Sequence, residues 1–74
     1  MKLSEIIFLE RHRKRLSQTE LGKRAGISRN YVSLIEGDAA TPSLAVLERL
    51  ALALDLTLHI ELTSAPARAA KGEE

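Results

Sequence analysis

The chain has 74 residues, of which 45% are hydrophobic and only 3% aromatic, and it has no cysteine and a formal net charge of +1. This length allows one small domain with an aliphatic core, and it excludes a disulfide framework and a thiolate metal site. The longest apolar run, residues 50–54, is far too short for a membrane span, and the N-terminus shows no signal-peptide pattern, so we expect a soluble, cytoplasmic protein without membrane association.

The hydrophobic pattern predicts four helices in the first 54 residues. A serine can cap the start of each helix: Ser4, Ser17, Ser28 and Ser43. The helices are predicted to reach about Lys14, Ala25, Gly37 and Leu54. Glu20 follows Ser17 by three residues and completes a capping box, while Gly26 can end the second helix in the left-handed conformation. The fourth helix is predicted to bury one apolar stripe: Leu44, Leu47, Leu50, Ala51 and Leu54.

The second and third helices fit a helix-turn-helix pattern. Gly22 removes side-chain bulk where two short helices cross steeply, and Gly26 supplies the tight turn. Apolar anchors for a bundle occur on both helices and in the turn: Leu21, Ala25, Ile27, Val32 and Ile35. In this motif the second of the two helices enters the DNA major groove by its N-terminal end. An ordinary helical hairpin with a glycine cap is the alternative interpretation.

The segment "LSQTELGKRAGISRNYVSLIEGDAATPSLAVLERLALAL" resembles the Xre family of phage-repressor and Cro-like helix-turn-helix domains. The likeness covers residues 1–54, about three-quarters of the chain. It implies an all-α fold, a compact four- to five-helix bundle of the repressor-like type. It also implies sequence-specific binding of an operator by a dimer.

Four residues of the third helix are predicted to read DNA bases: Arg29, Asn30, Ser33 and Leu34. They point away from Val32, which should face the bundle. Arg29 can pair with guanine O6 and N7, and Asn30 can pair with adenine N6 and N7. Ser33 can hydrogen-bond either kind of base edge. Leu34 stands where family members often carry a polar residue, so here it can only touch a thymine methyl or pack inward.

Phosphate contacts are predicted from helix starts and basic side chains: Gln18, Ser28, Tyr31, Arg13, Lys14, Arg15 and Lys23. Ser28 as a cap alone and Tyr31 as a purely structural residue are the alternatives for those two. The family resemblance implies the role of Gln18. It also implies that Arg11 pairs with Glu36 and thereby joins the first and third helices. In the loop after the third helix Asp38 replaces the cations of many relatives, which predicts weak backbone binding there.

From Asp55 onward, apolar residues recur at every second position. The apolar positions that alternate with polar ones are Leu56, Leu58, Ile60 and Leu62. This pattern predicts a half-buried strand over residues 55–62, and a lone strand favours pairing with a second chain across a homodimer. A continued helix, or a strand lying on its own bundle, is the alternative. Residues 63–74 are predicted to form a disordered tail.

Charge and the missing catalytic motifs favour a binding function. Residues 11–31 hold seven cations and one anion, whereas residues 32–62 hold one cation and five anions. This polarity suits a face turned toward a polyanion, although a solvated charged surface is the alternative. No catalytic set, phosphate loop or metal-spaced cluster occurs, and His12 and His59 each lack a second ligand nearby, so we expect no enzyme, cofactor or metal.

The sequence therefore predicts a DNA-binding transcriptional regulator, a repressor that binds a palindromic operator in double-stranded DNA as a homodimer. Two other classes of function stay open. One is an antitoxin that binds a cognate toxin and represses their shared promoter. The other is a protein-interaction module without DNA binding.

Overall fold

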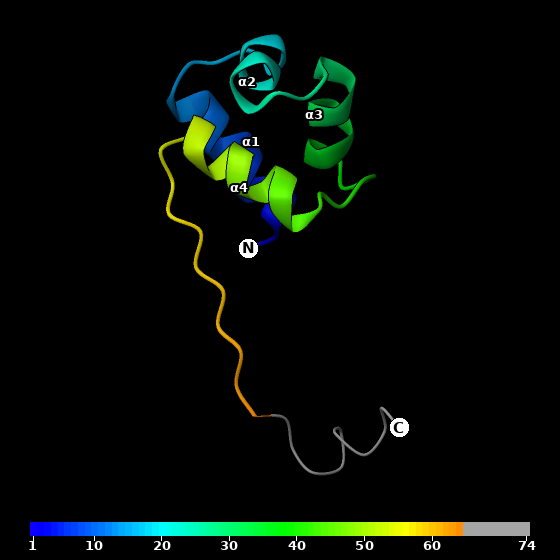
Figure 1. The fold of residues 1–74 in the computed structure, drawn as a ribbon. Helices are drawn as coiled ribbons and strands as arrows, with labels where there is room; N and C mark the ends of the chain where they lie inside the picture. The colour runs from blue at the N-terminus through cyan, green and yellow to red at the C-terminus, as the bar shows by residue number, and fades with distance from the viewer. Residues whose placement is uncertain (65–74) are drawn as a thin grey trace.

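The chain folds into a bundle of four helices: α1 (Leu3–Arg13), α2 (Gln18–Ala25), α3 (Arg29–Glu36) and α4 (Leu44–Ala53). The structure is a computed structural model and describes residues 1–64. Helix α2 packs against both α3 and α4, and α1 packs against α3 (Figure 1). The prediction of an all-α bundle is thereby confirmed. No helix within residues 1–64 combines the length and the apolar character that crossing a membrane requires.

The core is aliphatic and is shared by all four helices. Its buried apolar side chains are Ile7, Leu16, Leu21, Ala25, Val32, Ile35, Leu50 and Leu54. Each fully buried Leu, Ile or Val side chain contributes about 1.5–3 kcal/mol from removal of apolar surface from water. The predicted inner residues of α2 and α3 all lie in this core. The predicted stripe of α4 is buried only in part. Leu50 and Leu54 lie in the core and Leu44 is 53% exposed. Leu47 and Ala51 have intermediate burial.

Helix α1 begins differently from the prediction. Ser4 does not cap it, because the helix already starts at Leu3 and the Ser4 side chain is buried, at 6% exposure. The cap is supplied by Glu5, whose carboxylate accepts a hydrogen bond from the backbone N–H of Lys2 at 2.9 Å. A carboxylate in the first turn also interacts favourably with the positive end of the helix.

The turn between α2 and α3 contains the two glycines that the sequence singles out. Gly26 adopts φ 74° and ψ 32°, the left-handed conformation predicted for it. Gly22 lies where the turn passes closest to α2, because a Cβ added there would meet the carbonyl oxygen of Ile27 at 2.6 Å. The backbone N–H of Ile27 also donates to the carbonyl of Gly22 at 2.9 Å. The two glycines therefore fix how closely α3 approaches α2.

The start of α2 carries the predicted capping box. The backbone N–H of Glu20 donates to Ser17 Oγ at 3.0 Å, and the backbone N–H of Ser17 donates to Glu20 Oε1 at 2.8 Å. Hydrogen bonding from the Ser17 backbone and then from its side chain lowers the pKa of the Glu20 carboxyl below its usual value, with smaller contributions from Arg24 and Lys23. The ionised form of Glu20 therefore stabilises the folded chain.

We expect Glu20→Gln to lower the urea midpoint of unfolding at pH 7. Because the pKa of Glu20 is lower in the folded than in the unfolded chain, this stabilisation is present above the ordinary carboxyl pKa. It is lost as the pH falls through the folded-state pKa, so the difference between the two proteins should shrink once the pH drops below the ordinary carboxyl pKa and close below the lower, folded-state pKa. Glu48→Gln is the matched control, since Glu48 is exposed and lies within α4, away from its N-terminus. A gap that stays constant with pH would contradict the assigned role.

The chain leaves the bundle after α4 without forming the predicted strand. Asp55 adopts φ 58°, the backbone N–H of Leu56 donates to the carbonyl of Ala51 at 2.8 Å, and Leu56 packs against the core. Beyond Leu56 the described chain, which ends at residue 64, runs away from the helices with no strand hydrogen bonds (Figure 1). A strand needs a neighbouring extended segment, and the helices offer none. Of the predicted tail, residues 65–74 lie outside the described residues.

Candidate nucleic-acid interface

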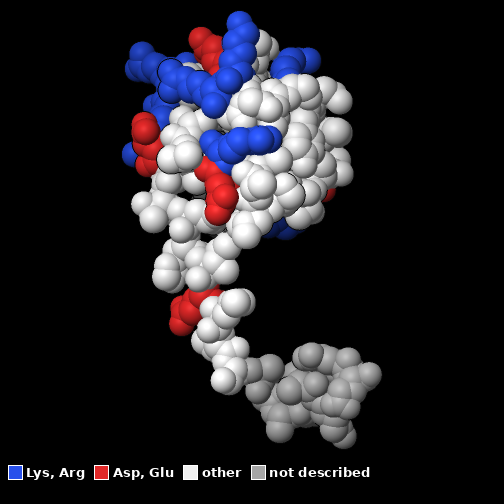
Figure 2. Space-filling model, in the orientation of Figure 1, with Lys and Arg blue, Asp and Glu red and all other residues white. Residues whose placement is uncertain are grey.

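Most lysine and arginine side chains in view gather at one end of the molecule. Figure 2 shows them over the end that carries α2 and the start of α3 in Figure 1. Five exposed cations lie on α2, at the start of α3, at the end of α1 and in the connection between α1 and α2: Arg13, Arg15, Lys23, Arg24 and Arg29. We call these five residues the basic end. Concentrated cations raise the local affinity for a polyanion, because bound counterions are released from it.

Helix α3 presents its polar side to solvent. Val32 and Ile35 are 0% and 1% exposed, so they hold one side of the helix against the bundle. The four predicted base-reading residues are all exposed: Arg29, Asn30, Ser33 and Leu34. An α-helix with its side chains is about 10–12 Å across, similar to the width of the DNA major groove. Leu34 is 40% exposed and therefore does not pack inward.

The N-terminus of α3 is capped by a side chain and keeps donors free. Ser28 Oγ accepts the backbone N–H of Tyr31 at 3.0 Å, so Ser28 is a helix cap. Tyr31 is half-buried and packs against the core, which places it between the bundle and the exposed side of α3. The backbone N–H groups of Arg29 and Asn30 have no partner within residues 1–64. Free N–H groups at a helix start suit an anion such as a phosphate.

A buried ion pair ties the C-terminal end of α3 to α1. Arg11 Nε donates to Glu36 Oε2 at 2.6 Å, and Arg11 Nη2 donates to Glu36 Oε1 at 3.0 Å. The two side chains are only 10% and 4% exposed. Arg11 Nη1 also donates to the carbonyl of Leu16 at 2.8 Å, in the connection between α1 and α2. This arrangement is the Arg11–Glu36 pair that the family resemblance implies.

Gln18 brings the start of α2 to the same carboxylate. Its Nε2 donates to Glu36 Oε1 at 3.1 Å, a contact that no sequence pattern indicates because the two residues are 18 positions apart. The side chain of Gln18 is therefore held by Glu36, and among described residues the backbone N–H groups of Gln18 and Thr19 keep no partner. Thr19 is exposed and was not predicted as a site residue, although its place in the first turn of α2 would indicate one.

The remaining predicted phosphate contacts differ in whether their side chains already pair with a carboxylate. Arg13 pairs with Glu10 at 3.0 Å on the surface, and Lys14 lies 4.0 Å from Asp55, next to the end of α4. Surface pairs of this kind are weak and exchange readily. In the part of the chain that the structure describes, the cations without an ion pair on the basic end are Arg15, Lys23, Arg24 and Arg29. Arg24 was not predicted, although its place beside Lys23 in a cationic stretch would indicate it.

Comparison with known proteins decides what this arrangement is. The profile of a family described as helix-turn-helix matches residues 9–60, which include α2, α3 and α4. The chain belongs to this Xre-like helix-turn-helix family. It is also 41% identical over 59 residues to the ImmF control region 10 kDa protein of Bacillus phage phi105. That alignment covers 80% of this chain and 66% of the phage protein, so the chain spans just under two thirds of that relative's length.

Membership in the helix-turn-helix family confirms the resemblance that the sequence motifs indicate. Within the matched residues α2 and α3 are the two helices of the helix-turn-helix motif. The close approach at Gly22 and the left-handed Gly26 are the features that form the turn.

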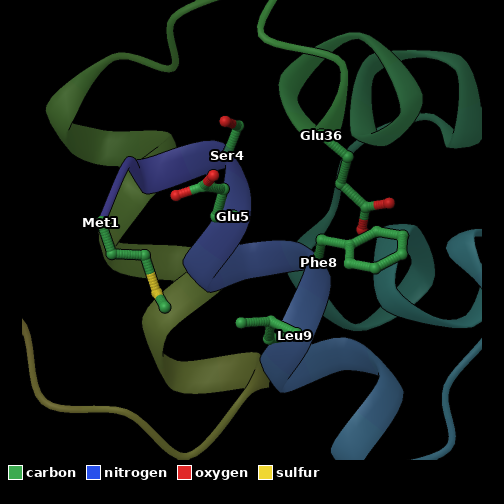
Figure 3. Close-up of a pocket in the computed structure, with 6 residues that line it drawn as sticks. All are labelled: Met1, Ser4, Glu5, Phe8, Leu9 and Glu36. Atoms are coloured by element: carbon green, nitrogen blue, oxygen red, sulfur yellow. The ribbon is translucent and has the colours of Figure 1, made fainter.

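A second surface of this helix-turn-helix protein has a different character. An open hollow of about 410 Å³ runs from the first half of α1 to the end of α3, and Figure 3 shows its lining residues: Met1, Ser4, Glu5, Phe8, Leu9 and Glu36. The Phe8 ring lies 4.2 Å from the His12 ring and 5.7 Å from the guanidinium carbon of Arg11. No predicted DNA-contact residue lines this hollow. Phe8 lies beside the buried Arg11–Glu36 pair.

Proposed function

We propose that the chain represses transcription as a homodimer that binds a palindromic operator. The observation that carries this proposal is the exposed side of α3, which lies opposite the buried Val32 and Ile35. This side includes Arg29, a residue of the basic end. The name of the phage relative, which assigns that protein to a control region, supports a regulatory role.

Each exposed residue of α3 has a distinct role in this proposal. Arg29, at the start of the helix, takes the O6 and N7 atoms of a guanine with its guanidinium fork. Asn30 takes the N6 and N7 atoms of an adenine, and Ser33 bonds a base edge one turn further along. Leu34 contributes an apolar contact with a thymine methyl, because its side chain has no hydrogen-bonding group and is exposed.

Phosphate contacts then come from both sides of the groove that α3 enters. At one side the free N–H groups at the start of α3, with the Ser28 hydroxyl as a donor, bind one strand. Gln18 contacts Glu36 at the opposite end of α3, so the start of α2 binds a phosphate of the other DNA strand. Basic side chains add charge neutralisation: Arg13, Arg15, Lys23 and, once its surface pair with Asp55 opens, Lys14. The Tyr31 hydroxyl also contacts a phosphate in this proposal.

The homodimer follows from the demands of a palindrome and from the segment after α4. Two α3 helices related by a two-fold axis read half-sites about one DNA turn apart, roughly 34 Å. Residues 55–62 provide the dimer contact in this proposal, because apolar and polar side chains alternate along them and the backbone groups from residue 57 onward are unpaired. A second chain also supplies buried surface that a small domain lacks.

Selection of bound sequences from random duplex DNA tests the proposed function. The expected result is a palindrome with two half-sites about one helical turn apart. A chain that enriches no sequence, and binds no duplex even at low ionic strength, would contradict it.

On the selected operator, Arg29→Ala is expected to bind roughly 5- to 150-fold more weakly, a loss of about 1–3 kcal/mol. The loss should be smaller on non-specific duplex, because a base contact carries sequence information. Binding curves from fluorescence anisotropy at fixed salt measure both values. Arg49→Ala is the matched control, since Arg49 is an exposed arginine on α4 and should leave the specific affinity unchanged. Equal affinities of wild type and Arg29→Ala for the operator would contradict the assignment.

A further inference from the structure

We propose that residues 56–62 of two chains pair as an antiparallel ribbon whose two-fold axis passes through His59. This inference rests on the proposed homodimer and adds the register of its interface, which fixes the residue that meets its own copy.

The bundle holds this segment only at its first residue. Leu56 packs against the core, and its backbone N–H donates to the carbonyl of Ala51 at 2.8 Å. From residue 57 to residue 64, the last one described, no backbone hydrogen bond occurs. Ile60 and Leu62 are 55% and 92% exposed. A row of open backbone groups beside an exposed apolar side is a template for pairing with another extended segment.

The orientation of the segment follows from its contact with the core. In extended chain, residues two apart point to the same side, so Leu58, Ile60 and Leu62 follow Leu56. Leu56 itself faces the core, and the other three continue its apolar side beyond the bundle. Thr57, His59 and Glu61 then point the other way, and all three are exposed.

The pattern of the segment identifies a second copy of this chain as its partner. Taken outward from His59, the residues in both directions are apolar, polar and apolar: Leu58, Thr57 and Leu56 on one side, and Ile60, Glu61 and Leu62 on the other. Reversal of the strand therefore preserves the arrangement of apolar and polar positions. An antiparallel copy of the same segment consequently places apolar side chains opposite apolar ones along its whole length.

This condition also selects the register. Directly opposite residues of an antiparallel pair share one side of the sheet, so only registers centred on a residue keep apolar positions together. A centre at His59 places Leu56 opposite the partner subunit's Leu62, and Leu58 opposite the partner subunit's Ile60. No apolar residue of the segment is then left without an apolar neighbour.

The two neighbouring registers each leave one leucine of the segment without an available apolar partner. A centre at Leu58 would require Leu62 to pair with the partner subunit's Leu54, which is 0% exposed within the core of its own bundle. A centre at Ile60 would place Leu56 opposite the partner subunit's Ser64, a polar residue. The structure and the pattern together therefore favour the register centred at His59.

Cysteine cross-linking tests this register, because the chain has no cysteine of its own. In the proposed ribbon the two Cβ atoms at position 59 are about 5 Å apart, close to the range of a disulfide. The two copies of position 57 are four residues apart along the ribbon, roughly 13 Å, and the same holds for position 61. Under mild oxidation at micromolar concentration, most of the His59→Cys protein should become a covalent dimer.

The matched variants make the outcome specific. Thr57→Cys and Glu61→Cys should each cross-link at least about tenfold more slowly than His59→Cys, whereas an equimolar mixture of the two should cross-link readily, since these positions face each other. His59→Ser should give no covalent dimer. The three cysteine positions are exposed outside the bundle, so the fold should be unaffected, and circular dichroism checks this. Faster self-cross-linking at position 57 or 61 than at position 59 would overturn the register.

Duplex binding of the same variants in reducing buffer separates this inference from the proposed function. If the unmodified chain binds its selected operator as a dimer but His59→Cys does not cross-link, the register is wrong and the regulator stands. If the chain is monomeric by light scattering at micromolar concentration, both the ribbon and the homodimer are overturned. If it binds no duplex, the proposed function fails whatever the cross-linking shows.

Discussion

Arg11→Met is expected to lower the free energy of unfolding by about 3–5 kcal/mol. The substitution removes the guanidinium that meets both oxygens of Glu36 and leaves a carboxylate whose side chain is only 4% exposed, with Gln18 as its remaining side-chain donor. The carbonyl of Leu16 loses a donor as well. Because small domains are stable by only about 5–15 kcal/mol, the variant should unfold at much lower urea concentration.

A double-mutant cycle separates the cost of an unpaired charge from the loss of packing. Glu36→Leu alone should also be strongly destabilising, since it leaves the Arg11 guanidinium buried without its carboxylate. Arg11→Met combined with Glu36→Leu removes both charges, and we expect it to be clearly more stable than the sum of the single changes implies. Urea unfolding followed by circular dichroism gives all four free energies. Additive single-variant losses would show that the pair is not coupled.

Gly22→Ala is expected to lower the free energy of unfolding by about 3 kcal/mol, at the upper end of the usual range for added bulk in a packed site. The new Cβ would lie 2.6 Å from the carbonyl oxygen of Ile27, and a backbone atom cannot move aside by changing rotamer. The backbone of Ser28 and Arg29 is 3.4 Å from the same point, so relief of the clash must shift the start of α3. Operator affinity should therefore fall together with stability.

Gly37→Ala is the matched control for this prediction. Its Cβ would lie 3.4 Å from the nearest carbonyl oxygen, that of Ser33, and Gly37 has φ −85°, which alanine adopts without strain. We expect a change of about 0.5 kcal/mol or less. Urea unfolding and operator binding measured side by side on the two variants decide the matter. Equal stabilities would show that the close approach at Gly22 does not restrict the turn.

Local patterns predicted the elements of this fold well. The capping box at Ser17 and Glu20 and the glycine at position 26 act within one or two turns of chain, so their geometry follows from neighbouring residues alone. The spacing of Val32 and Ile35 predicted which side of α3 is buried, and with it which residues are exposed. For these features the sequence carries the physical cause directly.

Long-range contacts explain where the sequence predictions fell short. Ser4 is a good capping residue by type, but its position on α1 turns it into the bundle, and Glu5 caps the helix instead. The side chain of Gln18 is held by Glu36, which only the packing of α2 beside the end of α3 brings near. The alternating segment after Asp55 meets no strand within residues 1–64, since pairing partners are a property of the assembly and not of local spacing.

The amino-acid composition gives this protein one useful intrinsic fluorophore. The chain contains one tyrosine, one phenylalanine and no tryptophan, so excitation at wavelengths that phenylalanine does not absorb gives emission from Tyr31 alone. That ring lies half-buried on α3, between the core and the exposed side of the helix. A single tyrosine at this boundary senses loss of the core and, in the proposed complex, a duplex bound against the exposed side of α3. Spectroscopic titration can therefore follow denaturation and duplex engagement in the unlabelled protein.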